Sequence, residues 1–423
     1  MRLNAIIKDI RSIKAFGNSM CPMLLEGDIV FLRKVTFSNI DVDDIICFRR
    51  GKKLITHKVI FKSKNYVITK GDNNAKSDAK VKISDILGRV YSVKRNGMLF
   101  NIDDTYLLQS SIYFDEIKRI VELFNLNRVE HVVLKGLPLH LFLEKKHPRR
   151  IYADCDILVA GKDIKKAKKV LKHEGYQSLD FSLSNEHRKL KHNVVEESFA
   201  KQINGFPVLF DIHYDANFMM TQLGKLEYLY SQKLLKKYTA TLLNNKQGVE
   251  IKGVKFWLLS HEDQIIYLFL HLFHHNFKGG YRYDILVKIL NSKYDTERLV
   301  KIITTYRLQN FIFAGLMLLQ KHYPNKKYEE IIRVMEVSSK LKRTIEMKIL
   351  PTKIFDDEDR IGGGVRRFML LFYLSPSPIT LKIFTFFDKQ VLYSVFWVFI
   401  AKTRQSILIR FPFSRGLLQV ITQ

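Results

Sequence analysis

A chain of 423 residues is too long for one ordinary hydrophobic core, so two or three domains are expected, and a hydrophobic content of 47% can fill them. Its net charge of +28, from 70 Lys and Arg against 42 Asp and Glu, predicts an anionic partner such as phosphate, nucleic acid or a membrane surface. Three cysteines without metal-ligand spacing argue against a disulfide framework and favour a reducing, cytoplasmic compartment. We expect neither a signal peptide nor a membrane-spanning run.

The first informative segment is residues 17–30, which read GNSMCPMLLEGDIV and place Ser19 in a small exposed turn before a β-branched run. Serine is a poor nucleophile unless a neighbouring base takes its proton, and histidine suits that task near neutral pH. Residues 55–60 read ITHKVI, a strand that carries His57 and Lys58. Because successive side chains of a strand face opposite ways, only one of these two can face Ser19.

A third segment, residues 69–74, reads TKGDNN and is followed by Asp78. The three segments in this order, together with Gly88-Arg89-Val90, resemble the signal peptidase/LexA-type serine peptidases from about residue 10 to about residue 95. His at the base position before a basic residue and Val is most similar to the endoplasmic-reticulum and archaeal type.

This resemblance implies a mostly β domain that needs no cofactor. Ser19 would be the nucleophile and His57 the general base, with Asp78 or Asp72 orienting His57 and backbone amides around Ser19 forming the oxyanion hole. The alternative is an inactive β domain that keeps the shape. Members of this family are normally anchored in membranes and act outside the cytoplasm, whereas no anchor is expected here.

Two strands further along the chain carry acidic residues. Residues 131–136 read HVVLKG, a short strand that ends at a turn, and residues 149–159 predict the next strand, with Asp154 and Asp156 on one face. Residues 206–214 predict another strand, and it carries the third acid of the group, Asp211. Carboxylates in this arrangement suit Mg²⁺, and a pair of such ions can hold the attacking and leaving oxygens of a phosphoryl displacement. The alternative for Asp154 and Asp156 is a solvated strand end, although Asp is depleted in strands.

These elements resemble the uncharacterised nucleotidyltransferase family of the DNA polymerase β-like superfamily, from about residue 105 to about residue 290. The shared features are Leu-Lys-Gly, an Arg before a strand, Asp-x-Asp with a Leu-Val tail and a later Asp-x-His. The resemblance implies a two-metal Mg²⁺ site and an NTP substrate. The residues that would contact the nucleotide are Lys135, Gly136, Arg150 and His213.

The remainder is predicted to be mostly helical. Residues 258–277 include His271 and His275, which are four apart, but a packed helix is a better interpretation than a metal site. Residues 360–423 hold nine Lys or Arg, one acid and twelve aromatic residues. This basic aromatic segment is either a helical subdomain with a core of aromatic rings or a surface that meets anionic lipid headgroups.

The predicted fold is therefore a multidomain α+β chain. A mostly β peptidase-like domain spans residues 1–98, an α/β nucleotidyltransferase core spans 99–235, and a helical domain that completes the transferase spans 236–423.

The first hypothesis is a bifunctional, cytoplasmic maturation enzyme. It would cleave a peptide or protein and transfer a nucleotidyl group, with the inner membrane surface as an alternative location. The second is a regulatory or toxin-like transferase whose peptidase domain cleaves the chain itself or senses peptides. A nucleic-acid-binding protein, or an RNA acceptor, fits the charge, but no recognised motif supports it.

Overall fold

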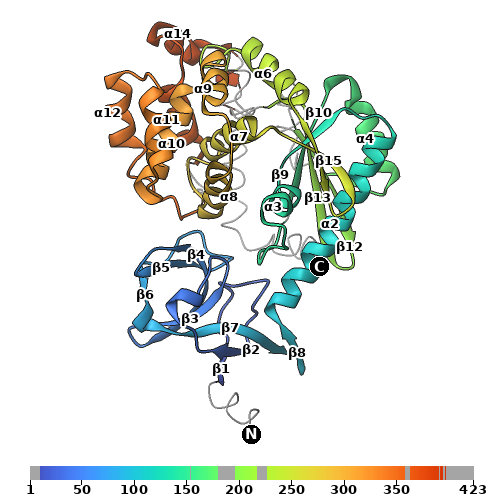
Figure 1. Ribbon diagram of the computed structural model, residues 1–423, viewed down its shortest axis with the longest axis vertical. Helices are drawn as coiled ribbons and strands as arrows, with labels where there is room; N and C mark the ends of the chain where they lie inside the picture. Colours follow the sequence, from blue (N-terminus) through green and yellow to red (C-terminus); the bar gives the residue numbers. More distant parts are fainter. Residues whose placement is uncertain are drawn as a thin grey trace.

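The computed structural model describes residues 10–152, 154–179, 196–216, 226–357, 363–389, 391–393 and 396. Within them the chain has a β-rich N-terminal part, a middle part built on a second sheet, and a helical C-terminal part (Figure 1). The prediction of a multidomain α+β chain with a β-rich start and a helical end is confirmed. Much of the basic aromatic segment, including residues 397–423, lies outside the described residues.

The N-terminal part is a sheet in which every described pairing is antiparallel, in the order β1-β2-β7-β3-β4-β5-β6, with β8 also paired to β7. Alternation of apolar and polar residues builds it; in β2, Val30 and Leu32 are buried while their neighbours are more exposed. Its strands are β1 (Ile10–Lys14), β2 (Ile29–Arg33), β3 (Ile45–Arg50), β4 (Lys53–Lys62), β5 (Tyr66–Lys70), β6 (Val81–Lys82), β7 (Ile86–Arg95) and β8 (Met98–Asn101).

One long helix, α2 (Ile102–Leu126), connects the two sheets: it follows β8 directly and leads through residues 127–130 to the second sheet. The side chain of Asn101 caps it by accepting a hydrogen bond of 2.9 Å from the backbone N–H of Asp103. The first turns bury Ile102 and Tyr106 in the core of the N-terminal part, whereas the later turns bury residues from Tyr113 onward in the core of the rest of the chain. The same helix therefore belongs to both cores.

The middle part is a mixed sheet in the order β11-β12-β13-β10-β9-β15-β14. Its strands are β9 (His131–Lys135), β10 (Asp154–Val159), β11 (Gln177–Ser178), β12 (Glu196–Ile203), β13 (Phe206–His213), β14 (Gln247–Ile251) and β15 (Val254–Leu258), and its helices are α3 (Leu137–Glu144), α4 (Ile164–His173) and α6 (Gln232–Asn244). The last two strands lie beyond residue 235, where the sequence places the end of the core. The sheet thus takes its edge from a hairpin in the segment that was predicted to begin the helical domain.

Helices form the remainder of the described chain. They are α7 (His261–His274), α8 (Gly280–Asn291), α9 (Thr296–Thr305), α10 (Gln309–His322), α11 (Lys326–Val334), α12 (Ser339–Lys348), α13 (Gly363–Leu374) and α14 (Ile379–Phe384). None of the helices that the structure describes combines the length and the apolar character needed to cross a bilayer.

Specific polar contacts join the N-terminal part to the other two. Asp356, which follows α12, accepts hydrogen bonds from the backbone N–H and the hydroxyl of Ser77, at 2.9 and 2.7 Å. The neighbouring Asp357 forms an ion pair of 2.7 Å with Lys70. On the side of the middle sheet, Arg149 pairs with Asp44 at 2.7 Å.

Candidate functional site

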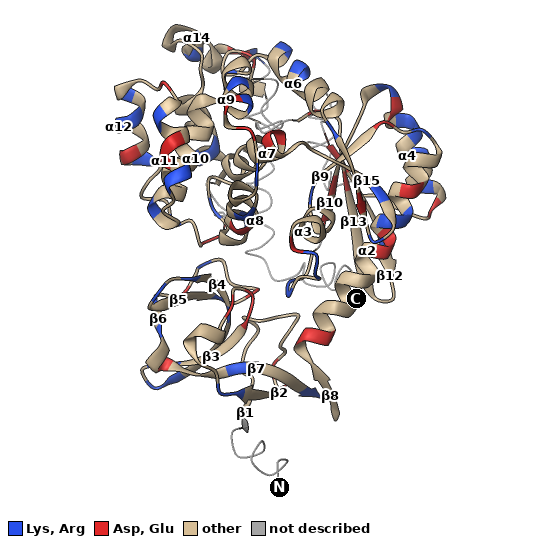
Figure 2. Ribbon diagram, viewed as in Figure 1, with Lys and Arg blue, Asp and Glu red and all other residues tan. Residues whose placement is uncertain are grey.

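The three predicted acidic residues of the middle sheet lie together. Asp154 and Asp156 lie two residues apart on β10, and the parallel pairing of β10 with β13 sets Asp156 directly opposite Asp211. One carboxylate oxygen from each of the three lies within 4.8 Å of the others. Figure 2 shows acidic positions on neighbouring strands of this sheet, whereas Lys and Arg are spread over all three parts of the molecule.

Lys135, at the end of β9, reaches this carboxylate cluster. Its ammonium lies 3.3 Å from Asp154 Oδ2 and makes a close contact with Asp156 Oδ2. Burial alone would lower the pKa of Lys135, but the charges of Asp156 and Asp154 outweigh it and raise that pKa. The lysine therefore stays charged and neutralises part of the acidic cluster.

Gly136 allows the turn after β9 to approach β10 closely. Its φ of 106° lies in the region that favours glycine, and a Cβ there would lie 3.1 Å from the carbonyl oxygen of Asp154. The helix α3 begins at the next residue. The Lys-Gly pair thus places the lysine and a helix start beside the acidic residues.

His213 lies two residues beyond Asp211 on β13, and its Nε2 lies 2.9 Å from Asp156 Oδ1. Burial would lower the pKa of His213, but the hydrogen bond to Asp156 and the charge of that carboxylate raise it. For Asp156, burial would raise the pKa, but Lys135 and His213 lower it to about 2. Asp156 is therefore ionised throughout the physiological range.

The pKa of Asp211, another carboxyl group of the cluster, is shifted upward, whereas that of Asp156 is shifted downward. Burial, together with the negative charge of Asp156, raises the pKa of Asp211 to about 6, although Ser198 donates a hydrogen bond to it. Two carboxyl groups that face each other oppose each other's ionisation.

The donor set fits a hard divalent cation. Oxygen atoms of carboxylates are the ligands that Mg²⁺ prefers, and three of them converge here. Lys135 and His213 already contact both oxygens of Asp156, but an ionised carboxylate offers about four lone-pair sites, so each oxygen can still act as a ligand. The predicted metal residues Asp154, Asp156 and Asp211 therefore lie where they could hold a metal together.

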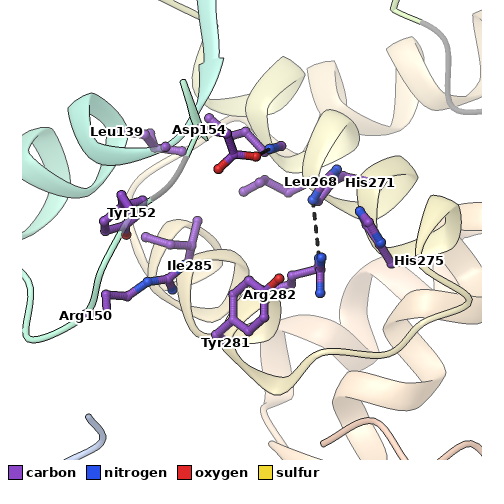
Figure 3. Close-up of a pocket in the computed structure, with 12 residues that line it drawn as sticks. Leu139, Arg150, Tyr152, Asp154, Leu268, His271, His275, Tyr281, Arg282 and Ile285 are labelled. Atoms are coloured by element: carbon purple, nitrogen blue, oxygen red, sulfur yellow. Dashed lines mark hydrogen bonds and ion pairs between the residues drawn. The ribbon is translucent and has the colours of Figure 1, made fainter. Parts of the chain in front are cut away.

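Two small cavities of about 160 and 210 Å³ adjoin the cluster, and Lys135 and Asp154 line both. Arg150 lines the smaller one, together with Gly136 (Figure 3). The guanidinium of Arg150 stacks between two aromatic rings, 4.3 Å from the centroid of Tyr152 and 4.8 Å from that of Tyr281. The four residues predicted to contact a nucleotide thus all lie at or beside the carboxylate cluster.

A second group of predicted residues lies together in the N-terminal part. Ser19 Oγ lies 3.0 Å from His57 Nε2, and His57 Nδ1 lies 2.6 Å from Asp78 Oδ2. Because a carboxylate only accepts, Nδ1 of His57 carries the proton and Nε2 is left to accept one from Ser19. Burial would raise the pKa of Asp78, but the hydrogen bonds from His57 and from Thr69 lower it.

Asp72, the alternative partner of His57, faces elsewhere. It forms an ion pair of 2.8 Å with Lys58, the neighbour of His57 on β4. Strand alternation accounts for the difference, because His57 and Lys58 point to opposite sides of the strand. Asp78 is therefore the acid that hydrogen-bonds His57, and Asp72 is not.

Gly71 lets the loop after β5 approach the backbone of Ser19 and the imidazole of His57. A Cβ at this position would lie 2.5 Å from the carbonyl oxygen of Ser19 and 3.0 Å from His57 Nε2. On the other side, Ser19 and His57 line a cavity of about 290 Å³ between residues 13–17 and residues 54–57. The serine hydroxyl thus faces a cleft between the end of β1 and the start of β4.

Sequence reasoning missed two sets of residues near these sites. Arg282 and Tyr281, at the start of α8, line the smaller cavity beside the carboxylate cluster, with Arg282 Nε 3.4 Å from His271 Nε2 (Figure 3). Asp356 and Asp357 contact Ser77 and Ala75 in the loop that leads to Asp78. No local pattern marks these residues, but the Gly279-Gly280 break before Tyr281 is a signal of a loop at a site.

Comparisons with known proteins agree with the middle part of this description. A model of an uncharacterised nucleotidyltransferase family matches residues 101–324, which is more than half of the chain and begins at the cap of α2. No curated protein matches the chain. A solved structure described as an antigenic nucleotidyltransferase-like protein from Paracoccidioides brasiliensis has 12% sequence identity and a TM-score of 0.33, over 54% of this chain and 97% of that one. A likeness this low carries no argument about function.

Proposed function

Because the chain belongs to the uncharacterised nucleotidyltransferase family, we propose that it transfers a nucleotidyl group from an NTP to an acceptor in a Mg²⁺-dependent reaction. The observation that carries the proposal is the convergence of Asp154, Asp156 and Asp211, with one oxygen of each within 4.8 Å of the others. Carboxylates that converge from two adjacent strands, next to a partly buried lysine, suit a site where metal ions and phosphates meet.

In the proposed reaction an acceptor oxygen bonds to the α-phosphorus of the NTP. The bond between that phosphorus and the bridging oxygen breaks, and diphosphate leaves with the electron pair. The proton of the acceptor passes to a carboxylate of the cluster, for which Asp211 is proposed. Bound Mg²⁺ would neutralise charge on the attacking and leaving oxygens.

The remaining residues of the site hold and orient the nucleotide. Lys135 supplies a positive charge beside Asp154 and can contact a phosphate as a point charge. Gly136 lets the N–H groups at the start of α3 face the same region. Arg150 is proposed to contact phosphate through its guanidinium, and His213 to orient Asp156.

Incubation of the full-length protein with each labelled NTP, Mg²⁺ and cell extract tests the proposal. We expect one labelled species that forms with the native protein and not with the Asp156→Asn variant. The Asp104→Asn variant is the matched control, because Asp104 is exposed on α2. Labelling that persists in Asp156→Asn contradicts the assignment of the site.

A second activity is proposed for the N-terminal part, that of a serine endopeptidase. The hydrogen-bonded series Ser19–His57–Asp78, with distances of 3.0 and 2.6 Å, supports it. In this arrangement His57 would accept the proton of Ser19, and Asp78 would hold the imidazole and stabilise its charged form. The cleft beside Ser19 could hold an extended peptide against the start of β4.

Covalent labelling by a fluorophosphonate probe tests this second activity without a known substrate. We expect the probe to bond to Ser19 in the native protein and not in the Ser19→Ala or His57→Gln variants. Equal labelling of the His57→Gln variant would exclude the proposed base.

Cleavage of the chain itself, if it depends on Ser19, favours a regulatory or toxin-like protein over a maturation enzyme. A labelled tRNA as the only transfer product favours an RNA acceptor.

A further inference from the structure

A cavity larger than the three described above lies between the N-terminal part and the other two parts of the chain. Its volume is about 610 Å³, within the range of small-molecule sites. All three parts contribute to its wall, for example Lys58 from the first, Tyr152 from the second and Tyr281 from the third. The contacts of Asp356 and Asp357 with Ser77 and Lys70 hold these parts together along its edge.

This interdomain cavity touches both groups of candidate residues. Asp154 of the carboxylate cluster lies in its wall and also lines the two smaller cavities at the cluster. Cys21 and Pro22, which follow Ser19 in the same turn, lie in another part of the wall. A single bound molecule can therefore contact the loop of Ser19 and the carboxylate cluster at the same time.

The two lysines in the wall of the cavity form ion pairs with carboxylates, whereas the two arginines do not. Lys58 pairs with Asp72 at 2.8 Å, and Lys70 pairs with Asp357 at 2.7 Å. Arg150 and Arg282 stack on Tyr281 at 4.8 and 4.4 Å. No carboxylate among the described residues forms an ion pair with either guanidinium, although the charges of Asp284 and of Asp43, which also lies in the wall, act on Arg150. Two guanidinium groups in the wall of a cavity, neither of them in an ion pair with a described carboxylate, are suited to bind an oxyanion of a ligand.

We propose that the interdomain cavity is the acceptor site of the transferase and that the acceptor is a peptide with an acidic side chain or a free carboxylate. The carboxylate contacts Arg282 and Arg150, and the reacting oxygen of the peptide lies toward Asp154. A peptide is favoured over a small acid because the turn that carries Ser19 forms part of the same wall. Each guanidinium has five N–H donors, so Arg150 can contact a phosphate of the nucleotide and the acceptor together. The proposal rests on the proposed transfer activity.

Cys21 provides a direct measure of occupancy. It is partly exposed and lines the cavity, whereas the other two cysteines, Cys47 and Cys155, are fully buried. The rate at which N-ethylmaleimide alkylates Cys21 in the full-length protein therefore reports whether the cavity is filled. This measurement needs no catalytic turnover.

The probes are a blocked tetraglutamate peptide, a blocked tetralysine peptide and inorganic tripolyphosphate, each added in the presence of Mg²⁺ and a non-hydrolysable NTP. At ten times its dissociation constant, tetraglutamate should slow alkylation about tenfold, whereas tetralysine should not slow it. Tripolyphosphate should not slow it either, since the nucleotide already occupies the phosphate positions. Equal protection by tripolyphosphate and tetraglutamate, or protection by tetralysine, overturns the proposal of an acidic peptide.

Variants identify the group that binds the carboxylate. Arg282→Gln should remove the protection by tetraglutamate, and Arg333→Gln, an exposed position on α11, should retain it. Protection that is unchanged in Arg282→Gln contradicts the site. Binding of the NTP, measured as a Mg²⁺-dependent rise in the thermal midpoint, is recorded separately. If the protein shows no such rise, the transferase assignment is wrong. If the rise is present but tetraglutamate gives no protection, only the acceptor proposal is wrong.

Discussion

Ser77 donates both its backbone N–H and its hydroxyl to one carboxylate oxygen of Asp356, a residue 279 positions later in the chain. Ser77 immediately precedes Asp78, the hydrogen-bond partner of His57. The backbone N–H of Asp357 also donates to the carbonyl of Ala75, at 2.8 Å. The helical part of the chain therefore holds the loop that supplies Asp78.

The first prediction follows from this contact. Asp356→Ala should lower the rate of fluorophosphonate labelling at Ser19 by about ten- to a hundredfold, because a small displacement of an orienting group costs that much. Asp356→Asn, which keeps an accepting oxygen, should retain most of the rate, and Asp104→Asn should retain all of it. A normal rate in Asp356→Ala would show that the loop holds its position without the helical part.

A second prediction separates the two basic residues of β4. His57→Ala should reduce Ser19 labelling by about a thousandfold or more, since the serine loses its base. Lys58→Ala should leave most of the labelling, because Lys58 pairs with Asp72 on the other side of the strand. If Lys58→Ala removes the activity and His57→Ala does not, the assignment of the base is wrong.

A third prediction uses the difference between two carboxyl groups of the cluster. Asp156→Asn removes the partner of buried His213 and of Lys135, which is largely shielded from solvent, so it should abolish metal binding and also destabilise the metal-free fold by about 3 kcal/mol. Asp211→Asn should abolish metal binding too, but it removes the repulsion between facing carboxyl groups and should not lower stability. Calorimetric titration with Mg²⁺ and Mn²⁺, and thermal unfolding without metal, measure the two effects. Full Mg²⁺ affinity in both variants would rule out the metal site.

A fourth prediction concerns pH. Burial lowers the pKa of His131, at the start of β9, to about 4 from an ordinary value of 6.5. The unfolded chain therefore binds a proton more readily than the folded chain, so the stability that neutral His131 gives is complete above pH 6.5 and is lost as pH falls toward 4.

The loss should amount to about 3 kcal/mol at most. Denaturant unfolding at pH 7 and pH 5 should show a smaller difference for His131→Asn than for the native protein. His173→Asn is the control, because His173 is exposed at the end of α4 and should leave the difference unchanged. An unchanged difference in His131→Asn would remove His131 as its source.

A fifth prediction concerns the start of the basic aromatic segment. Phe384, Phe386 and Phe387 are 54%, 49% and 70% exposed, which does not fit a segment whose aromatic rings are all in a core. We expect the full-length protein to float with anionic liposomes at low salt and not with neutral ones, since exposed rings and nearby cations suit anionic headgroups. Phe386→Ser/Phe387→Ser should reduce flotation, whereas Met98→Ser, an exposed apolar position on β8, should not. If the native protein stays in the soluble fraction with anionic liposomes at low salt, the membrane hypothesis is wrong.

Residues close in sequence to a motif could be predicted, whereas those brought together by the fold could not. Strand alternation predicted that His57 and Lys58 would separate, and the i, i+2 spacing predicted that Asp154 and Asp156 would share a face. The choice between Asp72 and Asp78 depended on the path of a loop, which no pattern in the sequence specifies. Asp356 and Arg282 were missed because their partners lie on other elements, distant from any motif.

The hairpin of β14 and β15 was missed for a different reason. Its residues alternate between apolar and polar, and Lys252 and Gly253 both have positive φ, which is typical of a tight two-residue turn. The signal was present, but long helical patterns on its C-terminal side favoured a helical domain from residue 236. Apolar–polar alternation over a few residues therefore identifies an edge hairpin of a sheet better than the predominant secondary structure of the surrounding region.

The helix α2 also restricts how this chain can change in length. It crosses from one core to the other near the exposed Leu107 and Leu108. One residue inserted there would turn the N-terminal part by about 100° about the helix axis and shift it by about 1.5 Å, so Cys21 and Asp154 would no longer share a cavity. Two whole helical turns inserted in place of that single residue would keep the orientation but would separate the parts by about 10 Å. Natural variation in the length of the chain is therefore expected in surface turns such as that between β7 and β8, and not within this helix.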